Sequence, residues 1–246
     1  ILMSGRVGSI TTAIISDGLI FNTDTANRAS YPKTGTTATD TVGNITGSLT
    51  NGTAFSNNNE GIFDFDGSDD YIDYGDVLDF DRLDPFSVNA WIKKDSTDEQ
   101  TIVGKMETSS NLKGWTFYFT GGTLLRLLLR RQNQTYNRLI TTVQSGDSIT
   151  DSDWHNVVCT YDGSSTTAGI NLYIDGQGPL SKTESGTLGG GTSLANSIPL
   201  QIGARNATLP FNGNIASVQI YNRELSATEV LHNYNALKGR FEWVDV

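Results

Sequence analysis

The sequence predicts an all-β fold, an antiparallel two-sheet sandwich with one short C-terminal helix. Charged residues are only 18% of the 246 residues, while 26 are glycine, a composition typical of many short strands joined by polar turns. Apolar segments follow one another at short spacing from Gly61 onward, without helical periods between them, so roughly eleven to thirteen strands are expected. A chain of this length is sufficient for one substantial core.

Side-chain alternation assigns the inward faces of three of the expected strands, because successive residues of a strand point to opposite sides. The predicted inward residues are Phe86, Val88, Ala90 and Ile92 in the first strand, Trp115, Phe117 and Phe119 in the second, and Leu125, Leu127 and Leu129 in the third. The single cysteine, Cys159, lies in another expected strand, so a buried thiol and no intramolecular disulfide are predicted.

The segment 225–239 predicts the single helix. Ser226 and Glu229 have the spacing of a capping box, and Leu225 and Val230 have that of a hydrophobic staple. Gly239 suits the helix end. The predicted apolar face, which should dock on the sandwich, consists of Val230, Leu231, Tyr234 and Leu237.

Three parts of the chain are distinguished by composition. Residues 1–60 are rich in Thr, Asn and Gly and are interpreted as an N-terminal arm with the first strands, which anchors the domain. Residues 61–239 form the strand-rich main domain, and residues 240–246 form a C-terminal tail. Phe241 and Trp243 have no expected core role in this tail, so contacts with partner proteins are predicted for them.

Charge and hydropathy exclude two classes of partner. The net charge of −10 argues against binding to nucleic acid, which requires neutralisation of phosphates. No stretch approaches the ~20 apolar residues that span a bilayer, so no membrane insertion is expected.

The segment "FDFDGSDDYIDYG" places three carboxylates, Asp66, Asp69 and Asp70, between two short apolar stretches. Calcium takes six to eight oxygen ligands, and these side chains supply part of such a shell. The pattern differs from an EF-hand, and Asp-Gly is favoured in tight turns. A structural hairpin is therefore the preferred interpretation, and a calcium site is the alternative.

This segment and those after it resemble a known family. "FSVNAWIKK", "TIVGK", "DSDWHNVVCTYDG", "NLYIDG", "LQIGA" and "FNGNIASVQIYNRELSATEV" follow in the order found in laminin-G-like, concanavalin A-like lectin/glucanase jelly rolls. The resemblance runs from about Gly61 to Leu237. It implies two curved antiparallel sheets stacked face to face, often with a calcium ion, in a family of carbohydrate binders, adhesive modules and glycosidases.

A second resemblance covers the ends of the chain. "MSGRVGSITTAIISDGLIFNTDTANRASYPKTGTT" and "NYNALKGRF" resemble structural proteins of large tailed bacteriophages. It implies a non-enzymatic virion structural or decoration protein, made in the host cytoplasm and displayed on the particle surface, with other virion proteins or further copies of itself as partners. The alternative function is a carbohydrate-binding module or adhesin that recognises host surface glycans.

Catalysis is not expected. The glucanase members of the resembled family carry Glu-x-Asp-x-x-Glu on one strand, and that motif is absent from the sequence. The seven glutamates are scattered among loops, the helix and the tail, whereas glycosidases need two carboxylates across one sugar. His155 is assigned to a strand and His232 to the helix.

Sugar and anion binding remain open from the sequence. The candidate sugar contacts are Trp91, Trp115, Tyr118, Tyr136, Asn111, Asn133 and Asn206, although a core or sheet-surface role is favoured for the aromatic residues. In "LLRLLLRRQNQ", Arg126 and Arg130 point outward with Arg131 nearby. They suit an anionic glycan or an acidic partner subunit, and a solvated outer face is the favoured alternative.

Overall fold

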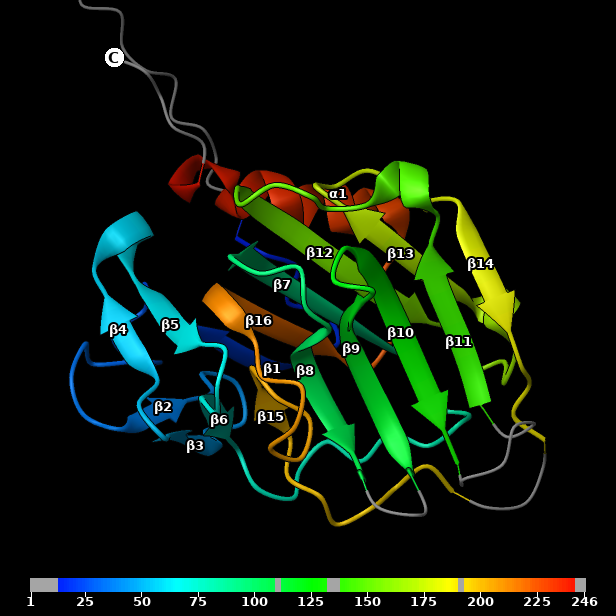
Figure 1. Ribbon diagram of the computed structural model, residues 1–246, viewed down its shortest axis with the longest axis horizontal. Coiled ribbons are helices and arrows are strands. Elements are labelled where there is room, and N and C mark those ends of the chain that lie inside the picture. The colour runs from blue at the N-terminus through cyan, green and yellow to red at the C-terminus, as the bar shows by residue number, and fades with distance from the viewer. Residues whose placement is uncertain (1–12, 109–111, 132–137, 190–192, 242–246) are drawn as a thin grey trace, which may run out of the picture.

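Two antiparallel sheets stack face to face in the computed structural model, and the single helix packs on the outer side of one sheet (Figure 1). The structure describes residues 13–108, 112–131, 138–189 and 193–241. In sheet A the strand order is β13-β12-β7-β16-β5-β4, with β1 also paired to β16. In sheet B the order is β14-β11-β10-β9-β8-β15-β6-β3-β2. The predicted two-sheet sandwich with a C-terminal helix is confirmed.

The elements have the following bounds. Sheet A consists of β1 (Leu19–Asp24), β4 (Ala54–Ser56), β5 (Ile62–Asp66), β7 (Phe86–Lys94), β12 (Trp154–Tyr161), β13 (Ile170–Ile174) and β16 (Asn212–Tyr221). Sheet B consists of β2 (Thr37–Thr39), β3 (Thr46–Thr50), β6 (Tyr71–Asp73), β8 (Gln100–Met106), β9 (Gly114–Thr120), β10 (Leu124–Arg130), β11 (Arg138–Val143), β14 (Lys182–Ser185) and β15 (Gln201–Ile202). The helices are α1 (Ala227–Leu237) and the short 3-10 turns η1 (Asn58–Glu60), η2 (Ser145–Asp147), η3 (Thr167–Gly169) and η4 (Lys238–Arg240).

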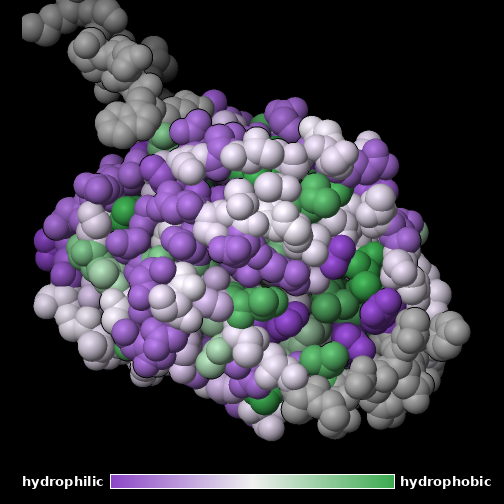
Figure 2. Space-filling model, in the orientation of Figure 1, coloured by the Kyte–Doolittle hydropathy of each residue, from purple (hydrophilic) through white to green (hydrophobic). Residues whose placement is uncertain are grey.

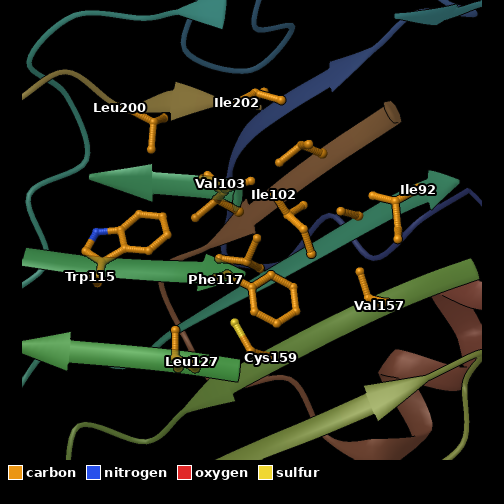
Figure 3. Close-up of a cluster of buried hydrophobic side chains, with 14 of the residues drawn as sticks. Ile92, Ile102, Val103, Trp115, Phe117, Leu127, Val157, Cys159, Leu200 and Ile202 are labelled. Carbon is orange, nitrogen blue, oxygen red and sulfur yellow. The ribbon is translucent and has the colours of Figure 1, made fainter. Parts of the chain in front are cut away.

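The main core lies between the two sheets. The predicted inward residues of β7, β9 and β10 are all buried, none more than 1% exposed. Figure 3 shows Ile92, Val157 and Cys159 of sheet A pointing toward Trp115, Phe117 and Leu127 of sheet B. Burying one such apolar side chain stabilises the fold by roughly 1.5–3 kcal/mol, so this layer holds the sheets together. The Cys159 thiol is fully buried, as predicted, and burial raises its pKa well above the ordinary value.

Helix α1 begins with the predicted capping box. The Ser226 backbone amide donates to Glu229 Oε2 at 2.9 Å, and the Glu229 amide donates to Ser226 Oγ at 3.4 Å. Leu225 and Val230 are buried against the outer face of sheet A. The predicted apolar face is wrong at Leu231, which is 41% exposed.

A polar residue takes the buried inner position of α1 instead of Leu231. Asn233 accepts a hydrogen bond from the Ile15 amide at 2.8 Å and donates one to the Tyr221 hydroxyl at 3.0 Å. These bonds satisfy the buried amide group, so a polar side chain is tolerated beneath the helix.

The first sixty residues contribute strands to both sheets. β1 and β4 pair with β16 and β5 in sheet A, while β2 and β3 extend sheet B beyond β6. Twelve of the sixteen strands in the described part of the chain follow Gly61, within the predicted range, and four lie in the first sixty residues, where the sequence marked fewer. The missed strands are short and rich in Thr and Ser, such as Thr37–Thr39, so they lack the apolar alternation by which strands are recognised.

The beginning of the C-terminal tail is part of the fold. Phe241 is only 6% exposed, and its ring stacks on Trp91 with centroids 4.2 Å apart, so the prediction that Phe241 has no core role is wrong. The Arg240 guanidinium lies 2.8 Å from Asp24 Oδ1 and also donates to the carbonyl oxygens of Asn59 and Gly61. Trp243, with the rest of 242–246, lies outside the described residues.

No helix in the described part of the chain is both long enough and apolar enough to span a bilayer.

Candidate functional site

The acidic turn connects the two sheets. Asp66 ends β5 in sheet A, and Tyr71 begins β6 in sheet B, so the predicted hairpin is wrong: these strands pair with other partners and not with each other. The turn itself forms as expected, since Asp66 Oδ1 accepts a hydrogen bond from the Ser68 amide at 2.8 Å and Gly67 has a φ of 76°. The local sequence specifies a turn here. The pairing of β5 and β6 with strands distant in the chain makes this turn cross from sheet A to sheet B.

The three carboxylates of the turn meet at one point. One oxygen each of Asp66, Asp69 and Asp70 lies within 4.8 Å of the others. Asp66 and Asp69 are exposed, whereas Asp70 is 3% exposed. Its Oδ2 accepts from the Asp66 amide at 3.0 Å, but its buried Oδ1 has no hydrogen-bond partner among the described residues. Burial raises the pKa of Asp70, and so do the neighbouring carboxylates. Three carboxylate oxygens around one point are the kind of donor that Ca²⁺ takes, so these residues fit part of its shell.

His155 forms a charged cluster that the sequence did not predict. Its Nδ1 lies 2.7 Å from Asp175 Oδ2, and its Nε2 lies 2.8 Å from Asp151 Oδ1. Burial alone would lower the pKa of His155, but the hydrogen bonds to the two aspartates outweigh it and raise the pKa to about 9. The imidazolium is thus held charged at neutral pH, which suits an ion pair at the rim of the sandwich better than a general base.

The predicted sugar contacts divide into three groups. Trp91 and Trp115 are buried, 2% and 1% exposed, which confirms the core role favoured for them. Tyr118 lies on the outer face of sheet B, and Asn206 donates to Thr108 Oγ1 at 2.9 Å. The remaining candidates, Asn111, Asn133 and Tyr136, lie outside the described residues. The structure therefore brings none of the described candidates together as a sugar platform.

A row of side chains on the outer face of sheet A forms a different candidate site. Cross-strand pairing places Trp154 of β12 opposite Lys93 of β7, Lys93 opposite Asn214 of β16, and Asn214 opposite Asp64 of β5. Directly opposed residues point to the same face of a sheet, so these four side chains line up across four strands. Asn214 Nδ2 donates to Asp64 Oδ1 at 2.9 Å, which fixes the amide.

Trp154, Lys93 and Asn214 of this row form the floor of an open pocket of about 680 Å³, which we call the Trp154 pocket. Asn58, Asn59, Ser152 and Asp153 line its walls, with Arg240 and Phe241 at one side. The indole of Trp154 is half-buried and packs against Phe241 with ring centroids 4.7 Å apart. Sequence reasoning did not single out Trp154, because the pocket depends on η1 and η4, which are distant in the chain.

The outward arginines of β10 are confirmed in part. Arg126 and Arg130 are half-exposed on the outer face of sheet B, while Leu125, Leu127 and Leu129 point inward. Arg131 is only 5% exposed, and its guanidinium donates to the Gly189 carbonyl oxygen. Arg131 is therefore a buried structural residue and does not belong to this face.

The stacked, fully antiparallel sheets define a jelly roll of the lectin type. A family model described as the concanavalin A-like lectin/glucanases superfamily matches residues 66–231, and the chain belongs to this superfamily. A search of the curated proteins finds no significant match.

Solved structures share the fold. The binding domain of Paraclostridial Mosquitocidal Protein 1 is 17% identical, with a TM-score of 0.62 over 89% of this chain and 52% of that one. The botulinum neurotoxin serotype G binding domain is 20% identical, with a TM-score of 0.61 over 88% of this chain and 50% of that one. The chain therefore spans about half the length of these toxin binding domains.

A match of similar quality covers a whole domain. Domain 4 of AbnA, an extracellular arabinanase from Geobacillus stearothermophilus solved with arabinotriose, is 17% identical, with a TM-score of 0.61 over 88% of this chain and 98% of that one. At these identities the similarity shows a common fold and nothing about a common ligand.

Proposed function

We propose that the protein is a non-catalytic, lectin-like module that binds a carbohydrate in the Trp154 pocket. The observation that carries the proposal is the row formed by Trp154, Lys93 and Asn214 on the floor of that pocket. Membership of a superfamily of lectins and glucanases supports it, as does the crystallised complex of the related arabinanase domain with arabinotriose.

The chemistry of the pocket suits a sugar ring. The apolar face of an indole packs against C–H groups, while amide, ammonium and carboxylate groups around it satisfy hydroxyl groups. Trp154 supplies the aromatic face, Lys93 donates, and Asp153 accepts. Phe241 packs against the indole at 4.7 Å and holds it in place, which reduces the entropy that binding would otherwise cost.

Glycan-array screening of the purified chain, followed by titration of the best ligand, tests the proposal. Trp154→Ala should weaken binding at least tenfold, and Trp154→Phe should retain part of it. Tyr71→Ala, which truncates a half-buried aromatic residue of sheet B, is the matched control and should bind normally. Unchanged affinity in a folded Trp154→Ala protein would refute the pocket assignment, and release of reducing ends from the bound glycan would refute the non-catalytic role.

We further propose that Asp66, Asp69 and Asp70 hold a calcium ion, which would link the ends of β5 and β6. The main support is the buried Oδ1 of Asp70, which has no hydrogen-bond partner in the described part of the chain. Calcium should raise the melting temperature relative to chelator, and Asp70→Asn should abolish that difference. Asp95→Asn, an exposed carboxylate elsewhere, is the control. Equal melting temperatures with calcium and chelator would argue against the site.

Display of this module on a phage particle remains a proposal that rests on the resemblance of the chain ends. Glycan binding and particle display are compatible, because a displayed jelly roll brings its pocket to a host surface. Mass spectrometry of purified particles from the source phage tests the proposal directly. Detection of the chain at fixed copy number would support display, and its absence from infectious particles would rule it out.

A further inference from the structure

The outer face of sheet B carries four half-exposed arginines, which we call the arginine face: Arg126, Arg130, Arg138 and Arg205. Arg130 of β10 stands directly opposite Arg138 of β11, and Arg126 stands opposite Tyr118 of β9. Figure 2 shows strongly hydrophilic and hydrophobic residues interleaved on this side of the molecule, where β9, β10 and β11 lie in Figure 1. The apolar residues between the arginines include Leu128 and Ile140.

The fourth arginine, Arg205, belongs to a loop that lies against sheet B. Arg205 follows β15 and passes close to Gly104 of β8. A Cβ added at Gly104 would lie 3.1 Å from the Cβ of Arg205, so the glycine leaves space for the loop. The guanidinium carbons of Arg205 and Arg126 each lie 5.8 Å from the Tyr118 ring centroid. Arg126 is also fixed by hydrogen bonds to Thr142 Oγ1 at 2.7 Å and to the Tyr118 hydroxyl at 3.2 Å. Two guanidinium groups are thus arranged around one aromatic ring.

Three arginines of this face, Arg126, Arg138 and Arg205, have no ion-pair partner in the part of the chain that the structure describes. Among the described residues, no carboxylate lies within 4.0 Å of the side-chain nitrogens of Arg126, Arg138 or Arg205. Burial lowers the pKa of Arg130, and the charges of Arg138 and Arg205 lower it further. Like charges directly opposite each other on neighbouring strands are destabilising. A protein with a net charge of −10 therefore gathers four cations at a position where they repel one another.

We propose that the arginine face binds an anionic glycan, a saccharide chain with sulfate or carboxylate groups. Planar guanidinium groups bind both anions in a two-pronged geometry, and bringing them together before binding lowers the cost of association. Among the described residues, the buried Nε atoms of Arg138 and Arg205 have no hydrogen-bond partner, so no bond in this part of the chain fixes that side of either guanidinium group. This site lies on the sheet opposite the Trp154 pocket and does not depend on it.

The polar groups around the arginines favour a saccharide over an acidic protein. Cross-strand pairing adds the hydroxyls of Thr183 and Ser185 of β14 beside Thr142 and Ile140, which extends the face with hydrogen-bonding groups. Tyr118 and Leu128 are only 4% and 8% exposed. The large exposed apolar residues within the described ranges are Val42, Leu83 and Leu231, and none of them belongs to a strand of this face. A protein interface needs an apolar centre, whereas a hydrated polyanion needs charge and hydrogen bonds.

Affinity measurements with dextran sulfate and unmodified dextran of equal length test the proposal. The intact chain should bind dextran sulfate, with an affinity that falls as salt rises, and should bind dextran at least tenfold more weakly. Arg138→Gln and Arg205→Gln should each weaken binding of dextran sulfate at least threefold, and the double variant at least tenfold. Arg28→Gln removes the same charge from an exposed residue elsewhere and should have no effect.

Two further variants keep the test decisive. Arg205→Lys preserves the charge and should restore part of the affinity lost in Arg205→Gln, which separates loss of charge from disturbance of the loop. Trp154→Ala should leave binding of dextran sulfate unchanged, so failure of the pocket and failure of the arginine face are distinguishable. Equal affinity for both polymers, no binding of dextran sulfate, or an equal loss in Arg28→Gln would overturn the proposal. Binding of poly-glutamate in preference to dextran sulfate would overturn it in favour of an acidic protein partner.

Discussion

The outer faces of the two sheets differ far more than their inner faces. Both inner faces are apolar and closed against each other. On the outer face of sheet A, Trp91, Val158 and Tyr173 are buried beneath α1 and the residues after it. The one α-helix among the described residues, α1, lies on sheet A, and the outer face of sheet B carries charged and hydroxyl side chains. The same strand geometry thus supports an outer face that is largely covered on sheet A and one that is uncovered on sheet B.

This difference shows where function can be sought in a sandwich. Inward residues are constrained by packing in both sheets, so they carry little information about the ligand. Outward residues are constrained only where something covers them. The uncovered positions, Trp154 at the edge of the α1 cover and the arginines of sheet B, are therefore the informative ones.

The largest expected effect tests the structural role of the outer face of sheet A. Phe241→Ala removes a ring stacked on Trp91 at 4.2 Å and should lower the free energy of unfolding by about 3 kcal/mol. Ile140→Ala, a truncation on the uncovered face of sheet B, should cost less than half as much. Urea denaturation of both variants measures the difference. Equal losses would mean that both outer faces are packed alike.

A smaller effect is expected at the rim of sheet A. His155 has a pKa raised to about 9, above the ordinary value of 6.5. The protonated His155 therefore stabilises the fold fully below pH 6.5, and this stabilisation is lost as pH rises through about 9. We expect the free energy of unfolding to fall by about 2 kcal/mol over this range. Urea denaturation at pH 6 and pH 9.5 measures it. His155→Gln should remove most of the pH dependence, and a persistent dependence would place its origin elsewhere.

The N-terminal cap of α1 offers a further test of the difference between the two outer faces, because α1 covers part of sheet A. Ser226→Ala removes the hydroxyl that accepts the Glu229 amide and should destabilise the protein by about 1 kcal/mol. Thr228→Ala, in the exposed first turn of the same helix, is the control and should change stability by less than about 0.5 kcal/mol. Melting temperatures of the two variants, with far-ultraviolet circular dichroism, distinguish loss of the cap from general loss of helix.

The smallest effect has the opposite sign. Arg138→Gln relieves the repulsion from Arg130 across the strand pair and should stabilise the protein by roughly 0.2–1 kcal/mol. Arg126→Gln loses two hydrogen bonds and should bring no such gain. Chemical denaturation in low salt compares them. A destabilising Arg138→Gln would show that this arginine serves the fold of sheet B and not recognition.

The features that the sequence predicted are those fixed within a few residues. Alternation placed Phe117 and Leu127 in the core, and the Ser226 and Glu229 pair marked the start of the helix. Predictions from these local signals were wrong where a strand pairs with a partner far away in the chain. Asp66 to Asp70 form the expected turn, but the flanking strands β5 and β6 pair with β16 and β15 and therefore belong to different sheets.

Only some residues of each candidate site were predictable from the sequence, because the others come from distant parts of the chain. Arg126 and Arg130 were recognised as outward residues, whereas Arg205 joins them through a loop about eighty residues away in the chain, a separation that local patterns do not span. The pocket needs Trp154, Asn58 and Phe241 together, and the fold alone brings them into contact. Phe241 was misjudged because its partner, Trp91, lies on a strand far earlier in the chain.

The position of β16 has a consequence for synthesis. This late strand lies between β7 and β5 and also pairs with β1, so sheet A cannot close until residues near 221 have left the ribosome. By contrast, β9, β10 and β11 pair with neighbours in sequence and can associate as soon as they emerge. During translation, sheet B is therefore half-assembled while its apolar inner side still lacks a complete partner, and the nascent chain is most prone to aggregation in that interval.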